Sequence, residues 1–433
     1  MKTRTRKTSG VSLSVIMSAW HDPVARMLNV DLLTVLLALL LPWSTTGVVI
    51  VAILFTIAVI PTLEPRAFLQ SLRRPVCILP VSMLVLALAG TLWSDAPWGD
   101  RLNAVGPTTK FLILPLLLYH YERSLRGSWI FIAFLTSCML LMAVSLVVAL
   151  APDLAPKAYL SRGPYYPESG IAVKNHIDQG QEFVLCAVAL AYPAITLLRH
   201  NRIWQAVLAA TIASGFLLNM VFVVISRTAL ATIPFMIALF ALLHLRLRLA
   251  IAAIFVAALL AGVVWNVSPR LRDAASQFVD EYQDTQIHDA PTRVGSRLEF
   301  WRKSLRFFID APVIGHGTGS TRGLFEQAAF GIGVHAEIVS NPHNQTLNVA
   351  VQWGSIGVIL LYAMWLIHLS LFRGEGLAQW IGLAVVAQNI FTSMFNSHLF
   401  DFQEGWIYVL GVGVAGGMTL NSSQAFASTS RQD

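Results

Sequence analysis

Charged residues are scarce in this sequence. Only 12% of its 433 residues are Asp, Glu, Lys or Arg, and 56% are hydrophobic, whereas an average soluble protein has about 25% charged residues. A water-soluble domain could not cover its surface with so few charges. Residues 30–41, 48–60 and 203–224 are apolar around their whole circumference, so lipid or neighbouring helices must surround them. The sequence therefore predicts an all-α, polytopic membrane protein.

Other absences narrow the chemistry. The three cysteines, Cys77, Cys138 and Cys186, all fall in apolar segments, which excludes a disulfide framework or a cysteine-based metal site outside the membrane. The polar segments contain neither a Walker loop for ATP nor an Asp-x-Asp pattern that could hold a divalent metal. The net charge of +7 is spread over short loops and forms no basic stripe. We therefore expect no cofactor, no metal and no nucleic acid partner.

Apolar segments separated by Pro, Gly or charged residues predict twelve transmembrane helices. They lie at about 28–43, 46–62, 76–93, 108–121, 128–151, 181–198, 203–225, 228–244, 249–266, 347–372, 377–395 and 404–420. If the N-terminus is cytoplasmic, every inner loop carries Lys or Arg and most acidic residues lie outside, which is the expected asymmetry. The basic start of the chain lacks a small-residue cleavage pattern. We interpret both termini as cytoplasmic.

Two outer segments, 152–181 and 266–346, are too long to be simple connectors. The second is rich in aromatic and apolar residues, so we expect it to be folded. We interpret residues 1–433 as one transmembrane domain. It contains a large, partly helical loop at 267–346, between the ninth and tenth spans, and it ends in a flexible tail at 421–433.

Residues 295–310 of the large loop predict an amphipathic helix. Ser296 and Glu299 have the spacing of a capping box. An apolar stripe is expected at Leu298, Trp301, Leu305 and Phe308, flanked by cations at Arg297, Arg302, Lys303 and Arg306. Such a helix would lie at the membrane surface, where its cations would face phosphates of a substrate or only anionic lipid headgroups.

The next segment, 311–320 (APVIGHGTGS), is a turn rich in Pro and Gly. The spacing of Gly315, Gly317 and Gly319 is similar to that of a dinucleotide loop, but no strand precedes it. The glycines either let backbone amides approach a ligand or pack a tight turn.

Two residues are the leading candidates for chemistry. His343 lies where the large loop enters the next span, and imidazole there can accept a proton near neutral pH; the alternative is a capping histidine. Arg227 lies where two spans meet with almost no loop. An ionisable residue at that depth suggests function, and the alternative is an ion pair with a carboxylate. His335 and His343 lack convincing carboxylate partners for a metal.

Further polar residues lie at the outer ends of spans. Lys174, Asn175 and His176 close the first long outer segment, and could line the same cavity or be ordinary loop ends. Asp401 closes the last outer turn and could pair with an arginine or orient a substrate sugar.

In this order along the chain, the motifs resemble the O-antigen ligase and polymerase superfamily of membrane glycosyltransferases. The residues that carry the resemblance are SRTA at 226–229, R-x-x-x-W at 297–301, the turn at 312–317, the pair His343-Asn344, and Gly354 with Gly357. The resemblance implies transfer of a glycan from undecaprenyl diphosphate in the outer leaflet of the bacterial inner membrane. For a ligase of lipopolysaccharide biosynthesis, the acceptor is lipid A-core.

The resemblance also implies roles for individual residues. His343 would be the catalytic histidine, and Arg227 and Arg297 would hold the diphosphate. Substrate binding is expected at Lys174, Asn175, His176, Arg293, Asn344 and Asp401. Independently, Arg can bind phosphate oxygens in bidentate fashion without a metal, which favours metal-independent displacement with inversion at the anomeric carbon.

Three other functions compete with a ligase. A polymerase of the same superfamily would use the same donor but extend a second lipid-linked glycan. A transporter would show inverted repeats and broken helices near the membrane midplane, whereas the polar features here cluster at one face. A scaffold for envelope proteins would not explain why the cation of Arg227 lies within the protein.

Overall fold

The computed structural model describes residues 22–151 and 170–429, and within them every regular element is a helix. The α-helices are α2 (Pro23–Leu40), α3 (Thr45–Val59), α4 (Pro65–Leu72), α5 (Pro75–Ala89), α6 (Trp98–Val105), α7 (Ile113–Tyr121), α8 (Gly127–Leu150), α9 (His176–Arg199), α10 (Ile203–Phe222), α11 (Arg227–His244), α12 (Leu247–Val267), α13 (Pro269–His288), α14 (Arg293–Asp310), α15 (Thr321–Gln327), α16 (Gln345–Leu371), α17 (Leu377–Thr392) and α18 (Phe402–Thr429). Short 3-10 helices are η1 (Ile60–Thr62), η2 (Gly106–Leu112) and η4 (Gly333–Ala336). The basic N-terminal segment and most of the first long outer segment lie outside the described residues.

The apolar segments of the sequence coincide with helices. Among the described residues, nine helices are long and apolar enough to cross a membrane, or ten if the bent pair α4 and α5 forms one span. The last two predicted spans fall on α17, which has only 16 residues, and on α18, and neither is among the nine. A multi-pass, all-helical architecture is therefore confirmed, and the count of twelve stays a prediction.

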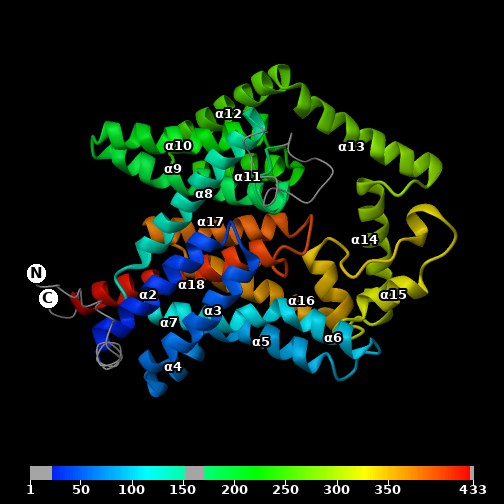
Figure 1. The fold of residues 1–433 in the computed structure, drawn as a ribbon, viewed down its shortest axis with the longest axis horizontal. Helices are drawn as coiled ribbons and strands as arrows, with labels where there is room; N and C mark the ends of the chain where they lie inside the picture. The colour runs from blue at the N-terminus through cyan, green and yellow to red at the C-terminus, as the bar shows by residue number, and fades with distance from the viewer. Residues whose placement is uncertain (1–21, 152–169, 430–433) are drawn as a thin grey trace, which may run out of the picture.

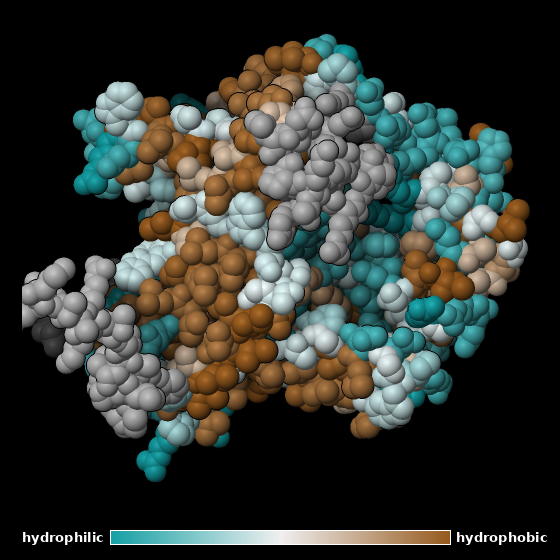
Figure 2. All heavy atoms as spheres, in the orientation of Figure 1, coloured by the Kyte–Doolittle hydropathy of each residue, from teal (hydrophilic) through white to brown (hydrophobic). Residues whose placement is uncertain are grey.

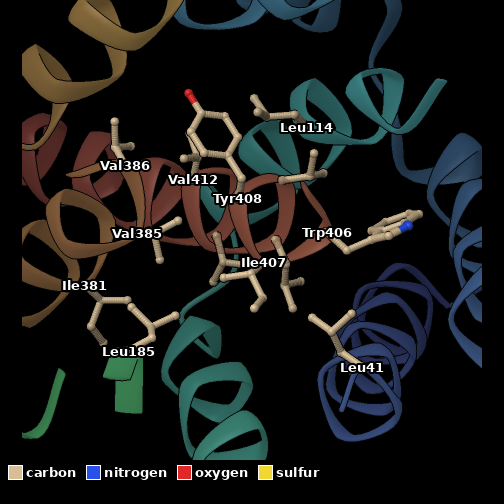
Figure 3. Packing of buried hydrophobic residues seen from close by; sticks show 14 of the residues in the cluster. Leu41, Leu114, Leu185, Ile381, Val385, Val386, Trp406, Ile407, Tyr408 and Val412 are labelled. Carbon is tan, nitrogen blue, oxygen red and sulfur yellow. The ribbon is translucent and has the colours of Figure 1, made fainter. Parts of the chain in front are cut away.

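The core of the bundle forms around α18 (Figure 3). Side chains of this helix pack against α7 and α17, and those fully buried there include Leu114, Tyr408 and Val412. Glycines in α18 let α7 come close, since a Cβ atom at Gly417 would lie 2.7 Å from the carbonyl oxygen of Leu118. The close approach leaves no room for a larger residue there.

The outer surface of the bundle is apolar. Figure 2 shows hydrophobic residues over the bundle helices and hydrophilic residues over α13 to α15. In α12 only Ala250 is buried, while large side chains such as Phe255 are 63% exposed. A helix with so much exposed apolar surface requires lipid around it, which agrees with a membrane protein.

The two ends of the molecule differ. Figure 1 shows the start of α2 and the end of α18 at one end, and α13, α14 and α15 at the other. At the first end, the buried carboxylate of Asp31 accepts a hydrogen bond from Ser124 at 2.8 Å and lies 3.2 Å from a guanidinium nitrogen of Arg126. Arg74 pairs there with Glu122 at 2.8 Å. These arginines belong to the loops that the sequence predicts to be cytoplasmic.

The last helix continues to Thr429, into the segment where we expected a flexible tail from residue 421. The sequence after Gly417 contains no Pro or Gly that would end a helix. Each further residue then adds one hydrogen bond to an existing helix at little cost. Residues 421–429 are therefore helical, the flexible tail stays a prediction, and 430–433 lie outside the described residues.

Candidate active site

The amphipathic helix predicted at 295–310 is α14, but it starts earlier than the capping box suggested. Its N-cap is Thr292, whose hydroxyl accepts a hydrogen bond from the backbone amide of Gly295. Ser296 is buried inside the helix, and Glu299 bonds to Arg302. The capping box is therefore wrong. The hydroxyl of Thr292 also lies 2.6 Å from that of Thr285 in α13. This contact joins α13 and α14 in a tight hairpin.

The face of α14 that packs on the protein also differs from the predicted stripe. Phe300 and Phe307 are buried in a cluster with Phe325 of α15 and Val351 of α16. The residues of the predicted stripe lie on a neighbouring face, where Leu305 is 51% exposed. The aromatic rings next to the stripe bury more apolar area against α15 and α16, so they decide the packed face.

The cations on α14 have different surroundings. Lys303 is buried, and its ammonium group donates to the carbonyl of His335 at 2.7 Å. It therefore binds protein rather than headgroups. Arg302 and Arg306 are exposed, and their expected role at headgroups stays a prediction.

The turn at 311–320 packs against α16 and holds it open at a break. Gly354 has a left-handed φ of 58° inside α16. Beside this break, the amides of His316 and Gly317 donate to the carbonyls of Val351 and Gln352, both at 2.9 Å. A Cβ atom at Gly315 would lie 2.5 Å from the backbone of Gln352. Of the two interpretations for these glycines, the structure supports the tight turn.

His343 is held at the entrance to α16. Its backbone has a left-handed φ of 54°, and its amide donates to the side-chain oxygen of Asn341 at 2.9 Å. The imidazole is half-buried, and Nδ1 lies 2.8 Å from Oδ1 of Asn396. The helix cap is the next residue, Asn344, whose Oδ1 accepts from the amide of Leu347 at 3.1 Å. His343 is therefore not the capping residue.

Asn344 itself is occupied by the protein. Besides capping α16, its Nδ2 donates to the carbonyl of Met394 at 3.0 Å. These two bonds give the side chain a structural role, whereas the resemblance implied a role in substrate binding.

The connection between α17 and α18 continues the hydrogen bonds from His343. Nδ2 of Asn396 donates to Oδ2 of Asp401 at 2.7 Å, and Nδ1 of His398 lies 3.2 Å from the same oxygen. The ammonium of Lys110 donates to the carbonyl of Asp401 at 2.6 Å. Asp401 therefore pairs with a histidine and not with an arginine.

His398, Asp401 and Glu404 form the one group of His, Cys, Asp and Glu in the described ranges that could hold a metal ion. Burial lowers the pKa of His398, but the charges and hydrogen bonds of Glu404 and Asp401 outweigh it and raise the pKa to about 9. The imidazole of His398 lies between the two carboxylates, with Nδ1 3.2 Å from Asp401 and 3.5 Å from Glu404, and its raised pKa favours the imidazolium. The arrangement therefore fits an ion network better than a metal site.

Three arginines gather around one carboxylate at the start of α11 and α14. Arg227 holds Glu281 of α13 with two guanidinium nitrogens, at 3.0 and 3.3 Å. Nε of Arg293 lies 3.5 Å from the same carboxylate. Burial, and then the charges of Arg227 and Arg293, lower the pKa of Arg297. The ion pair that we gave as the alternative for Arg227 is thus present, and a second and a third arginine lie beside it.

The residues before α9 are fixed by the protein. Asn175 is the N-cap of α9, and its Oδ1 accepts from the amides of Ile177 and Asp178. The ammonium of Lys174 donates to the carbonyl of Leu41 and to the side chain of Gln403. Burial lowers the pKa of Lys174, partly opposed by nearby acidic groups. Asn175 is therefore a cap, and Lys174 is a half-buried cation between α2 and α18.

Two links connect the arginines with the histidine. On α14, the ring of Phe300 lies one turn after Arg297 and stacks on His343, with 6.2 Å between ring centroids. At the start of α9, His176 lies within electrostatic range of Arg293, and Asp178 within range of Asp401. The arginines, His343 and the α17–α18 connection therefore surround one region at the end of the bundle that carries α14.

A sequence model of the O-antigen ligase family matches residues 210–362. This part of the chain is similar to the O-antigen ligase family. The match runs from within α10 to within α16, so it includes Arg227, Arg297 and His343. A search of curated proteins finds no match.

Some residues of the candidate site were not singled out from the sequence. Glu281 is an ordinary acidic residue of a polar loop, and no signal distinguishes it. Asn396 and His398 lie in the segment NSHLFDFQEG before α18, where Asp401 alone attracted attention. The density of polar residues there, between two apolar spans, was the available signal.

Proposed function

We propose that this protein is an O-antigen ligase, which transfers a glycan from undecaprenyl diphosphate to lipid A-core at the periplasmic face of the bacterial inner membrane. In this proposal the chain has twelve spans with both termini in the cytoplasm, and the loop at 267–346 is periplasmic. The observation that carries the proposal is the arginine cluster near a histidine whose ring is held by a hydrogen bond from Nδ1 to Asn396.

The arginine cluster suits a diphosphate. Arg227 grips both oxygens of the Glu281 carboxylate, and a phosphate offers the same pair of oxygens to a guanidinium fork. Arg293 and Arg297 add charge on the same side. We infer that the diphosphate of the donor displaces Glu281 and takes its place between the arginines. Fixed positive charge then stabilises the leaving group without a metal or ATP.

His343 supplies the base. In the transfer step, Nε2 of His343 takes the proton from a hydroxyl of the acceptor sugar, and that oxygen attacks the anomeric carbon of the glycan. The bond between the anomeric carbon and the diphosphate oxygen breaks, and the electron pair leaves with undecaprenyl diphosphate. Attack from the side opposite the leaving group inverts the configuration at the anomeric carbon.

The decisive experiment is transfer by purified protein from a lipid diphosphate glycan to lipid A-core, with a chelator present and no nucleotide. We expect product on lipid A-core, and a loss of activity of at least about 1000-fold for His343→Ala. The matched control is His200→Ala, in the exposed turn between α9 and α10. Arg227→Ala should raise the donor KM, with Arg322→Ala on α15 as its control.

The products decide between the candidates. Longer lipid-linked chains in place of a lipid A-core product would identify a polymerase. Loss of transfer with the chelator would overturn the metal-free step, and normal rates in His343→Ala would overturn the role of the histidine.

A further inference from the structure

The segment around His343 is bound to the α17–α18 connection along its length. The amide of Gln345 donates to the carbonyl of Ser393 at 2.9 Å, and the hydroxyl of Ser397 donates to Asn341 at 2.7 Å. Asn341 in turn holds the amide of His343. Two adjacent residues, Asn396 and Ser397, thus fix the ring and the backbone of His343 respectively.

The bonds of Asn396 determine which way its amide points. A carboxylate only accepts hydrogen bonds, so the atom that faces Asp401 must be the NH₂ group. The other atom, which faces His343 at 2.8 Å, is then the carbonyl oxygen. A carbonyl oxygen also only accepts, so Nδ1 of His343 must carry a proton. In the neutral imidazole, Nε2 is left as the proton acceptor.

We propose that Asn396 is a positioning residue that holds His343 in the tautomer with its proton on Nδ1, and that Asp401 orients Asn396 for this purpose. The inference rests on the proposed role of His343 as the base. Asn396 does not touch the substrate in this arrangement. It acts by fixing the direction of the ring and by keeping Nε2 free of a proton.

The charges around His343 come from two elements. Asp401 and His398 lie behind Asn396 in the α17–α18 connection, and the opposing charges of this pair largely cancel. Arg297 lies one turn from the stacked Phe300 on α14. A neutral amide is therefore the direct partner of the ring, and replacing it with an acid would add a negative charge at the point of contact.

Two variants test the inference in the transfer assay. Asn396→Leu keeps the branched shape but removes both hydrogen bonds, and we expect kcat to fall about 10- to 100-fold with little change in the donor KM. Asn396→Asp retains an acceptor but stabilises the imidazolium, so the acid limb of the kcat–pH profile should move to higher pH. In this variant the new carboxylate is also repelled by Asp401. This repulsion lowers the rate and likewise moves the acid limb to higher pH. Asn266→Ala, at the exposed end of α12, is the control.

The outcomes separate this inference from the proposed function. A wild-type kcat in Asn396→Leu, or an unmoved acid limb in Asn396→Asp, would overturn the positioning role while an inactive His343→Ala leaves the base in place. If His343→Ala is itself active, the proposed function fails first. When Asn396→Leu is combined with His343→Ala, it should cause no further loss of activity, because Asn396 acts through the imidazole ring that His343→Ala removes. Donor binding by each variant checks that it is folded.

Discussion

Neutralising Glu281 should strengthen binding of a diphosphate, because this carboxylate occupies the arginine cluster. The Arg227 side chain is 31% exposed and that of Glu281 16%, and a pair of this exposure is worth up to about 1 kcal/mol. The bidentate geometry and the nearby Arg293 place the cost of displacing Glu281 at about 1–2 kcal/mol. About 1.4 kcal/mol corresponds to a factor of ten in affinity. The variant Glu281→Gln should therefore bind a diphosphate roughly 5- to 30-fold more tightly than the wild type does.

Farnesyl diphosphate is a suitable soluble probe, and its affinity for the purified protein can be measured by calorimetry at two salt concentrations. Asp284→Asn is the matched control, because it removes the same charge from α13 where Asp284 pairs with His288 at 2.9 Å. Equal affinity in wild type, Glu281→Gln and Asp284→Asn would refute the reasoning. Weaker binding in Glu281→Gln would mean that the carboxylate orders the arginines and does not compete with the ligand.

Three further results are expected. Gly354→Ala should lower the free energy of unfolding by at least about 2 kcal/mol, seen as a lower melting temperature in detergent, because its Cβ would lie 2.4 Å from the carbonyl of Val313 at a φ of 58°; Gly262→Ala, which meets nothing within 4 Å, is the control, and an equal effect in both would contradict the account of the break. Arg227→Lys should raise the donor KM about tenfold, because an ammonium cannot form the bidentate bond, and an unchanged KM would remove Arg227 from the diphosphate site. The pKa of His398, raised from 6.5 to about 9, contributes stability that is complete below pH 6.5 and is lost as the pH rises through 9, so the melting temperature should fall across that window in wild type but not in His398→Gln.

The helices were predictable from the sequence because hydropathy is a property of each segment. The twelve apolar segments coincide with helices, and α14 lies where its pattern indicated. The packed face of α14 was not predictable, because Phe300 and Phe307 are buried by partners on α15 and α16 that the local pattern does not contain. The length of α18 was missed because a polar composition was taken as a sign of flexibility.

The arginines and the histidine could be named from the sequence because such residues are unusual at the ends of apolar segments. The residues that these side chains contact could not be named from the sequence. Glu281 and Arg227 are separated by 54 residues, and Asn396 and His343 by 53. An ordinary Glu and an ordinary Asn gain their meaning only when the fold brings them to these side chains. The sequence analysis did not consider that Asn175 and Asn344 could be caps, although a polar residue before a span is often its cap, and their role in substrate binding stays a prediction.

The broken part of α16 has a consequence for protein engineering. The turn at 311–320 supplies amides to the carbonyls of Val351 and Gln352, so the extramembrane loop and the first half of this span share one set of backbone bonds. A chimera whose exchanged loop does not form the same turn would leave those carbonyls without donors inside the protein. A chimera between relatives should therefore exchange residues 311–356 together, as one unit.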